Sequence, residues 1–339
     1  MNRYLNGNPL PLLLEGTNPA VRYLTLRDIA GESGSRLESA YSAMRDCSFT
    51  KDILTHSKNG ILGDPENFAS IGSGSGWVLA QAVSYGLDCR EPLVEKTIAN
   101  IFSRWQNPDG GISGRWKPRH PDACLTGEIL RLALLAGYAG EETRRAARWI
   151  TDHQREDGGW LHCPVAGFLG MTTFLLFNRS GAGLSREADP ATRSCIIATA
   201  ACAMALSFLR SGDDACTRAL VRASEFLLSS RLSPSSGTLV TPYNSGLYGT
   251  EPRLGLPVFC QYDILYGLLC TVRAGHFSDP RTGEPFNFIM MRQSPEGVIP
   301  YDNFNKGMLF TKEDDAGSGG QSLWTTLKFL RILKSAGEL

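Results

Sequence analysis

The sequence predicts an all-α protein, an α/α toroid in which about six helical hairpins form an inner and an outer ring of helices. Three observations predict it: polar, glycine-containing turns that recur along the chain, pairs of helical-period runs between those turns, and a last helix whose apolar face needs a partner. No stretch of alternating apolar and polar residues is long enough to indicate a strand. We expect one domain over residues 1–339.

The recurring turn is clearest in two segments, QNPDGGI from Gln106 and QREDGGW from Gln154. Related turns begin at His56 (HSKNGIL), Arg231 (RLSPSSGTL) and Gln293 (QSPEGVI), and the first three turns lie about 50 residues apart. Asp and Gln side chains can satisfy backbone groups left open where a helix ends, glycines supply positive φ, and an aromatic residue can wedge between hairpins. We therefore interpret the turns as brackets that join helix pairs.

Between the turns, each unit pairs an apolar helix with an amphipathic one. The clearest apolar run, over residues 125–136, stops at Gly137, and the following run, over 141–154, is charged on one face. A helix that is apolar all round should be buried, and an amphipathic helix should cover it. The same couplet is predicted over 76–86 with 92–105, 195–209 with 214–230 and 259–274 with 280–292, and further helices are expected over 20–30, 36–46, 50–55 and 322–336.

The two ends of the chain favour a closed ring over an open solenoid. A solenoid needs polar caps on its terminal repeats. Here the last helix, SLWTTLKFLRIL from Ser322, keeps an apolar face, and the start, NPAVRYLTLRDIA from Asn18, is suited to cover it. Closure would bury both faces.

Composition excludes several classes of partner. With 34 basic and 34 acidic side chains and no basic stripe interleaved with aromatics, the chain lacks the electrostatic footprint of a nucleic-acid-binding protein. No apolar run approaches the roughly 20 residues of a membrane span. The nine cysteines are an odd number in a large chain without a signal peptide, which favours reduced thiols and a cytoplasmic protein.

With these turns, the chain resembles the prenyltransferase and squalene-cyclase repeat superfamily. The signature turn of that superfamily is a Gln followed within a few residues by Gly-x-Trp, which residues 154–160 match in full and residues 106–112 match except for the final aromatic. Segments 18–31, 124–138 and 322–334 look like its bacterial single-domain branch, so the resemblance covers nearly the whole chain. It implies an α/α barrel that holds an isoprenoid in a central apolar cavity.

Cysteines near the starts of the predicted inner helices suggest a zinc site. Protein prenyltransferases carry an Asp-x-Cys at an inner helix start and a His at the next, and Asp122-Ala-Cys124 resembles the first half of that arrangement, whereas the next inner helix offers Cys195 and no His. We predict Cys124, Cys163 and Cys195 as ligands, with His162 or Asp122 as the fourth, and zinc as the candidate cofactor. The alternative is that Cys124 and Cys195 are buried packing residues and that Cys163 is an ordinary loop thiol.

Acidic residues offer a second kind of chemistry. The Asp-x-Asp-Asp acid of squalene-type cyclases is absent, and KEDD at 312–315 lies in a glycine-rich loop typical of a solvated cluster. Asp263, beside Tyr262 at an inner helix start, is a candidate proton donor if burial raises its pKa, and a helix N-cap is the alternative. The catalytic candidates are therefore Asp263, Tyr262 and Asp122.

These patterns support three functional hypotheses. The first is a terpenoid cyclase or prenyltransferase-like enzyme, zinc-dependent if the thiols bind metal, that acts on a hydrophobic, isoprenoid small molecule. The second is a ring that only binds a lipid or a protein. The third is a carbohydrate-active toroid, for which Asp122 and Asp263 are the only opposed carboxylates. Two long irregular segments, 163–192 and 232–257, are apolar enough to act as lids.

Overall fold

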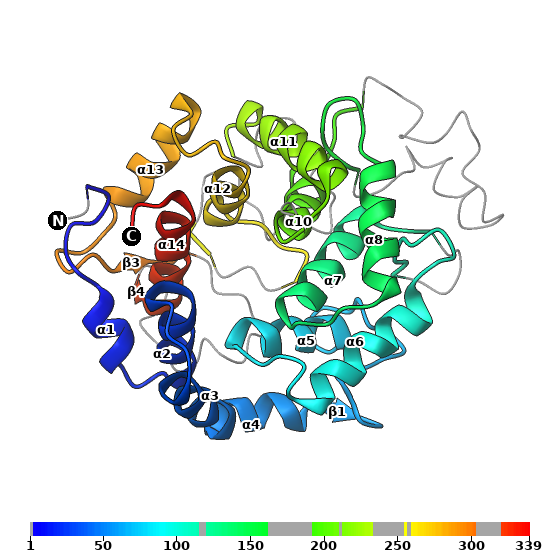
Figure 1. Ribbon diagram of the computed structural model, residues 1–339, viewed down its shortest axis with the longest axis horizontal. Helices are drawn as coiled ribbons and strands as arrows, with labels where there is room; N and C mark the ends of the chain where they lie inside the picture. The colour runs from blue at the N-terminus through cyan, green and yellow to red at the C-terminus, as the bar shows by residue number, and fades with distance from the viewer. Residues whose placement is uncertain are drawn as a thin grey trace.

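The chain forms a closed ring of helices in two layers, with its two ends side by side (Figure 1). This computed structural model describes residues 3–114, 120–161, 192–209, 212–232, 254–255, 259–302 and 320–339. The arrangement confirms the predicted all-α toroid. None of the helices in the described ranges is both long and apolar enough to cross a bilayer.

The inner layer is formed by helices that follow one another around the ring: α2 (Pro19–Thr25) continued by the π-helix η1 (Leu26–Ala30), α5 (Ser75–Tyr85), α7 (Ala123–Leu135), α10 (Ile196–Ser207), α12 (Ile264–Arg273) and α14 (Leu323–Ala336). The outer layer contains α1 (Leu10–Glu15), α3 (Ser35–Asp46), α4 (Ser48–Thr55), α6 (Pro92–Trp105), α8 (Glu141–Asp152), α11 (Asp214–Ser229) and α13 (Gly283–Met290), which the short 3-10 helix η3 (Pro280–Thr282) precedes. Two short antiparallel pairs occur in the turns: β1 (Ser57–Lys58) with β2 (Ile61–Leu62), and β3 (Ile299–Pro300) with β4 (Gln321–Ser322).

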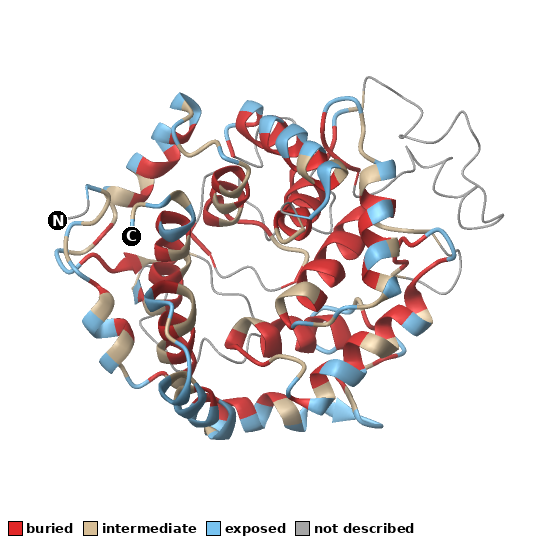
Figure 2. Cartoon of the chain, in the orientation of Figure 1, coloured by how far each residue is buried: buried red, intermediate tan, exposed pale blue. Residues whose placement is uncertain are grey.

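Burial follows the predicted division into inner and outer helices (Figure 2). Every residue of α10 is buried, whereas α8 buries one face and exposes its charged face. The inner helices approach one another closely because Gly127 of α7 has no side chain: a Cβ there would lie 2.6 Å from the backbone nitrogen of Cys202. The Cys202 thiol donates to Ala123 O at 3.3 Å, so this cysteine is a core residue.

The recurrent turns are brackets, as predicted. Gln154 Nε2 donates to Gly158 O of its own turn and to Ala219 O of α11, both at 2.8 Å. Gln106 Nε2 repeats this with Gly110 O at 3.0 Å and with the backbone of α8 at 2.9 Å. Glycine is required in the turn because Gly158 has φ +87°, and because a Cβ there would lie 2.4 Å from a carbonyl oxygen of α11. Each bracket thus ties one hairpin to the next outer helix.

The same bracket closes the ring. Gln293 Nε2 donates to Tyr4 O at 2.8 Å, and the Asn6 N–H donates to Gln293 Oε1 at 3.0 Å, so the last described bracket binds the N-terminal segment. Arg3 pairs with Glu338 across the two ends at 2.9 Å. Helix α14 also packs against α1, α2 and η1. The apolar face of the last helix is therefore covered by the start of the chain, as the closed-ring prediction requires.

Two local features differ from the sequence prediction. Helix α12 begins at Ile264, five residues later than the predicted start at 259, because Asp263 is its N-cap and accepts from Tyr266 N at 2.7 Å. Helix α1, which was not predicted, forms in the proline-containing N-terminal segment, where Pro11 occupies a first-turn position that needs no N–H donor. The turn predicted from Arg231 continues outside the described residues.

Replacing Gln154 with Ala should lower the free energy of unfolding by about 2 kcal/mol, because two carbonyl oxygens lose their donor. Urea denaturation of the purified variants measures this. Glu156→Ala, an exposed change in the same turn, is the control and should leave the midpoint unchanged. Equal midpoints for the two variants would show that Gln154 is not a structural bracket.

Candidate functional site

A cavity of about 550 Å³ lies at the centre of the ring. All the inner helices contribute to it, which is why it exists only when the ring is closed. Its apolar lining consists of Leu24, Val83, Leu135, Met204, Phe208, Leu269 and Trp324. Its charged lining consists of Arg27, Asp28, Arg131, Arg273, Lys328, Arg331 and Lys334.

The cavity lies toward the C-terminal ends of several inner helices. Ser84 is the last residue but one of α5, Leu135 ends α7, and Arg273 ends α12. The sequence prediction placed the site at the opposite mouth, where the inner helices begin. Of the predicted catalytic and zinc-binding residues that the structure describes, none lines this cavity.

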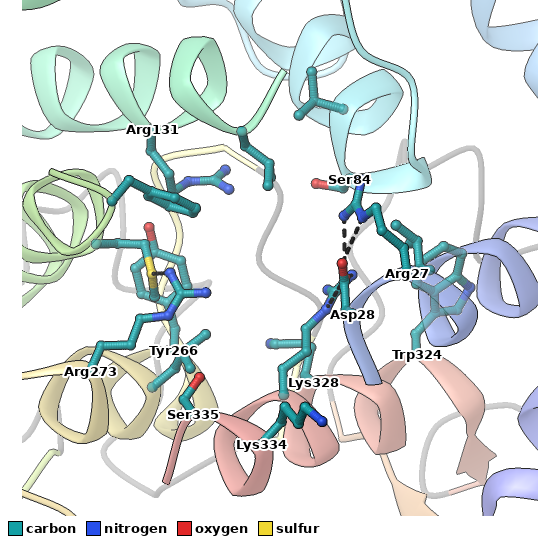
Figure 3. A pocket seen from close by; sticks show the side chains of 17 residues that line it. Arg27, Asp28, Ser84, Arg131, Tyr266, Arg273, Trp324, Lys328, Lys334 and Ser335 are labelled. Carbon is teal, nitrogen blue, oxygen red and sulfur yellow. Dashed lines mark hydrogen bonds and ion pairs between the residues drawn. The ribbon is translucent and has the colours of Figure 1, made fainter. Parts of the chain in front are cut away.

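Helical spacing places the basic side chains in the cavity. Lys328, Arg331 and Lys334 recur at intervals of three residues, so they lie along one face of α14. Arg27 and Asp28 are adjacent in η1 and both line the cavity, in a π-helical turn of the kind often found at functional sites. Figure 3 shows Arg27, Asp28 and Lys328 facing Arg131, Tyr266 and Arg273 across the cavity.

Asp28 joins the first and last inner helices inside the cavity. Its carboxylate accepts from Arg27 Nε at 2.6 Å and pairs with Arg331 at 2.5 Å, as the dashed lines in Figure 3 mark. Burial alone would raise the pKa of Asp28, but Arg331 and Arg27 together lower it below its usual range. The group is therefore ionised at neutral pH and is the only carboxylate among the described residues that line the cavity.

Two further carboxylates, which do not line the cavity themselves, pair with cations that do. Asp263 pairs with Lys328 Nζ at 2.6 Å, and Glu128 accepts from Arg131 Nε at 3.1 Å on the same helix. Counted over the part of the chain that the structure describes, the lining contributes six cations, and these two groups and Asp28 contribute three carboxylates, so positive charge is in excess.

Burial disfavours the charged form of two of these cations. It lowers the pKa of Arg273, whose NH1 donates to Ser207 Oγ at 3.1 Å. It also lowers the pKa of Lys328, although Asp263 opposes the shift. Partly dehydrated cations are stabilised by an anion more strongly than solvated ones. The cavity thus combines an apolar wall with groups that favour a negative charge.

The predicted catalytic residues make structural contacts at the starts of inner helices. Asp263 caps α12, and its carboxylate also accepts from Gly255 N at 3.1 Å. The Tyr262 hydroxyl donates to Leu232 O at 3.0 Å. The Asp122 carbonyl accepts from Thr126 N at 2.9 Å in the first turn of α7. Catalytic roles for these three residues stay predictions.

The predicted zinc ligands are described only in part. Cys124 and Cys195 are buried, and the hydrogen bond with Cys124, together with burial, raises the pKa of Cys260 well above its usual value. His162 and Cys163 lie outside the described residues. Among the residues that are described, no group of three or more His, Cys, Asp or Glu side chains is placed to hold a metal ion.

Other predicted features also fall outside the described part of the chain. The KEDD segment at 312–315 is one of them. The two predicted lids, 163–192 and 232–257, are described only at residues 192, 232 and 254–255. A role for these segments as lids stays a prediction.

Comparison with known proteins gives only distant structural neighbours. No protein-family profile matches the sequence, and no curated protein matches it. A crystal structure of a protein from Actinoplanes is 14% identical with a TM-score of 0.33, covering 88% of this chain and 99% of that one. The type II terpene cyclase MstE from Scytonema is 12% identical with a TM-score of 0.32, covering 88% and 98%. Likeness this low carries no argument about activity, so the function is argued from the cavity.

Replacing Asp28 with Asn should lower the free energy of unfolding by about 2 kcal/mol at pH 7, because two arginines lose their counter-ion. A carboxyl group whose pKa is lowered by folding stabilises the fold above its unfolded pKa, and this contribution is lost as the pH falls through the folded pKa. The difference between wild type and variant should therefore shrink below about pH 4. Thermal denaturation from pH 7 to pH 2 measures it, and a difference that does not change with pH would contradict the assignment.

Proposed function

We propose that the protein binds an isoprenoid substrate, an apolar chain with an anionic head, in the central cavity and acts on it as a terpenoid cyclase or prenyltransferase-like enzyme. The observation that supports this is the excess of cations on the wall of an otherwise apolar cavity. A site for a neutral hydrocarbon would not need these groups, whose burial has an electrostatic cost.

The volume of the cavity and the chemistry of its lining both fit an amphipathic anion. A cavity of about 550 Å³ is in the range that encloses a small-molecule ligand. Burial of an apolar chain against Leu24, Phe208 and Trp324 is favourable by roughly 25 cal/mol per Å². Charge-assisted hydrogen bonds from Arg273 and Lys328 would hold the head.

The charge pattern favours departure of the anionic head over protonation of the chain. In a prenyl diphosphate, the carbon–oxygen bond breaks, the electron pair leaves with the diphosphate, and an allylic carbocation remains. Arginine and lysine side chains stabilise the charge that develops on the leaving group. The faces of Trp324 and Tyr266 would stabilise the carbocation. Protonation needs a neutral carboxylic acid, and Asp28, Asp263 and Glu128 are each paired with a cation.

A ring that only carries an amphipathic anion is the second candidate. This candidate is favoured because the three carboxylates placed in or next to the cavity, Asp28, Asp263 and Glu128, are each held in an ion pair. The carbohydrate hypothesis gains no support, because Asp122 and Asp263 do not line the described cavity.

Titration calorimetry with three probes tests the proposal. Farnesyl diphosphate should bind more tightly than inorganic diphosphate, which lacks the chain, and more tightly than farnesol, which lacks the charge. Arg273→Gln should weaken binding of farnesyl diphosphate about tenfold. Arg144→Gln removes the same charge from the exposed face of α8 and is the matched control.

The outcomes separate the candidates. Farnesol that binds as tightly as its diphosphate, or equal binding by the two arginine variants, would refute an anion-selective cavity. Mass spectrometry after incubation with farnesyl diphosphate distinguishes an enzyme, which releases diphosphate and a new product, from a carrier, which returns the probe unchanged.

Zinc binding stays a prediction from the sequence, and no step above depends on it. If Cys124 is a ligand, elemental analysis of freshly purified protein should find about one zinc per chain, and Cys124→Ala should lower the zinc content. Cys216→Ala changes a buried thiol of the outer helix α11 and is the control. A wild type free of zinc, or equal zinc content in both variants, would reject this ligand set.

A further inference from the structure

The hydroxyl group of Tyr266 is placed where the described part of the fold offers it no hydrogen bond. Its hydroxyl is buried and has no hydrogen-bond partner among the described residues. A buried hydroxyl without a partner destabilises a protein by roughly 1–3 kcal/mol. Phenylalanine would fill the same space without that cost, so the hydroxyl calls for an explanation beyond the described residues.

The Tyr266 side chain lies on the wall of the central cavity among basic groups. Tyr266 lines the cavity from α12, and Arg273 lies seven residues later, two turns along the same face of that helix. The Arg131 guanidinium of α7 lies 6.0 Å from the Tyr266 ring centroid. Figure 3 shows these three side chains together on one wall, opposite Arg27 and Asp28.

The groups around Tyr266 determine which kind of atom a ligand must place beside them. A guanidinium only donates hydrogen bonds, so an atom bound next to Arg131 and Arg273 must be an acceptor. Burial raises the pKa of Tyr266 well above its usual value, so the phenol keeps its proton at neutral pH and can donate it as well. On the opposite wall, Asp28 already supplies an acceptor to Arg27 and Arg331, and on this wall Glu128 supplies one to Arg131.

We infer that Tyr266 is a specificity-determining residue, which donates a hydrogen bond to an anionic oxygen of the ligand held against Arg131 and Arg273. This inference rests on the proposed binding of an anionic head in the cavity. It adds that the head lies against the α7–α12 wall, and that a ligand is selected by an oxygen acceptor at that point as well as by its charge.

Another buried tyrosine provides a matched comparison. Tyr23 of α2 is 1% exposed, and its hydroxyl accepts from Arg90 NH2 at 3.1 Å, so that hydroxyl has a partner within the fold. Tyr23 does not line the cavity. Removal of the two hydroxyls should therefore have opposite effects on folding and on binding.

The experiment compares Tyr266→Phe with Tyr23→Phe, using titration calorimetry with inorganic diphosphate and farnesyl diphosphate, and thermal denaturation without ligand. Tyr266→Phe should weaken both probes about tenfold and should not lower the melting temperature, because the lost hydroxyl has no partner among the residues that the structure describes. Tyr23→Phe should lower the melting temperature and bind both probes like wild type.

Each other outcome has a distinct meaning. If wild type binds the probes and Tyr266→Phe binds them equally well, the role of Tyr266 is overturned while the proposed function stands. A lower melting temperature for Tyr266→Phe with unchanged affinity would show that its hydroxyl serves the fold. If wild type binds neither probe, the proposed function fails, and the role of Tyr266 fails with it.

Discussion

Closure of the ring is the constraint on which the rest of the structure depends, and one repeated interaction provides it. The side-chain amides of Gln106 and Gln154 each donate to their own turn and to the backbone of a neighbouring segment, and Gln293 makes the second of these contacts. In Gln293 that neighbour is the start of the chain, so the bracket that joins hairpins along the sequence also joins its two ends. Without this join, the inner faces of α14 and α2 would be open to water, and the central cavity would lose one wall.

The cavity follows from closure, and its charge follows from what the inner helices carry into it. The inner helices are mostly apolar, so the basic residues on their inward faces are partly dehydrated once the ring closes. Asp28 shows how the fold manages this: it neutralises Arg27 and Arg331 and, in doing so, links the first inner helix to the last. Lys328 is neutralised in the same way by Asp263, the N-cap of the neighbouring helix. The remaining excess of positive charge is what an anionic ligand would satisfy.

The architecture was predictable because its signals are local. The hairpins can be recognised in the sequence because each helical run ends before a glycine-containing turn. In the structure a glycine of such a turn, Gly158, has positive φ. The site was not predicted in the same way, because which mouth of the ring holds the cavity depends on how the helices pack. The sequence pointed to polar residues where inner helices begin, and Asp263 there is engaged by its cap and its lysine. A usable signal was present: Arg273 is the single charged residue of the otherwise apolar helix α12, and a charge in such a place seldom occurs without a partner or a ligand.

The account therefore depends on one claim, that an anionic head binds inside the ring against Arg273 and Tyr266 of α12 while its apolar chain fills the rest of the cavity. A crystal structure of the protein with farnesyl diphosphate tests this claim most directly. It should show the diphosphate in contact with Arg273 and Tyr266. A diphosphate located instead at the opposite mouth, beside Asp122 and Cys124, or on the outer surface of the ring, would contradict it.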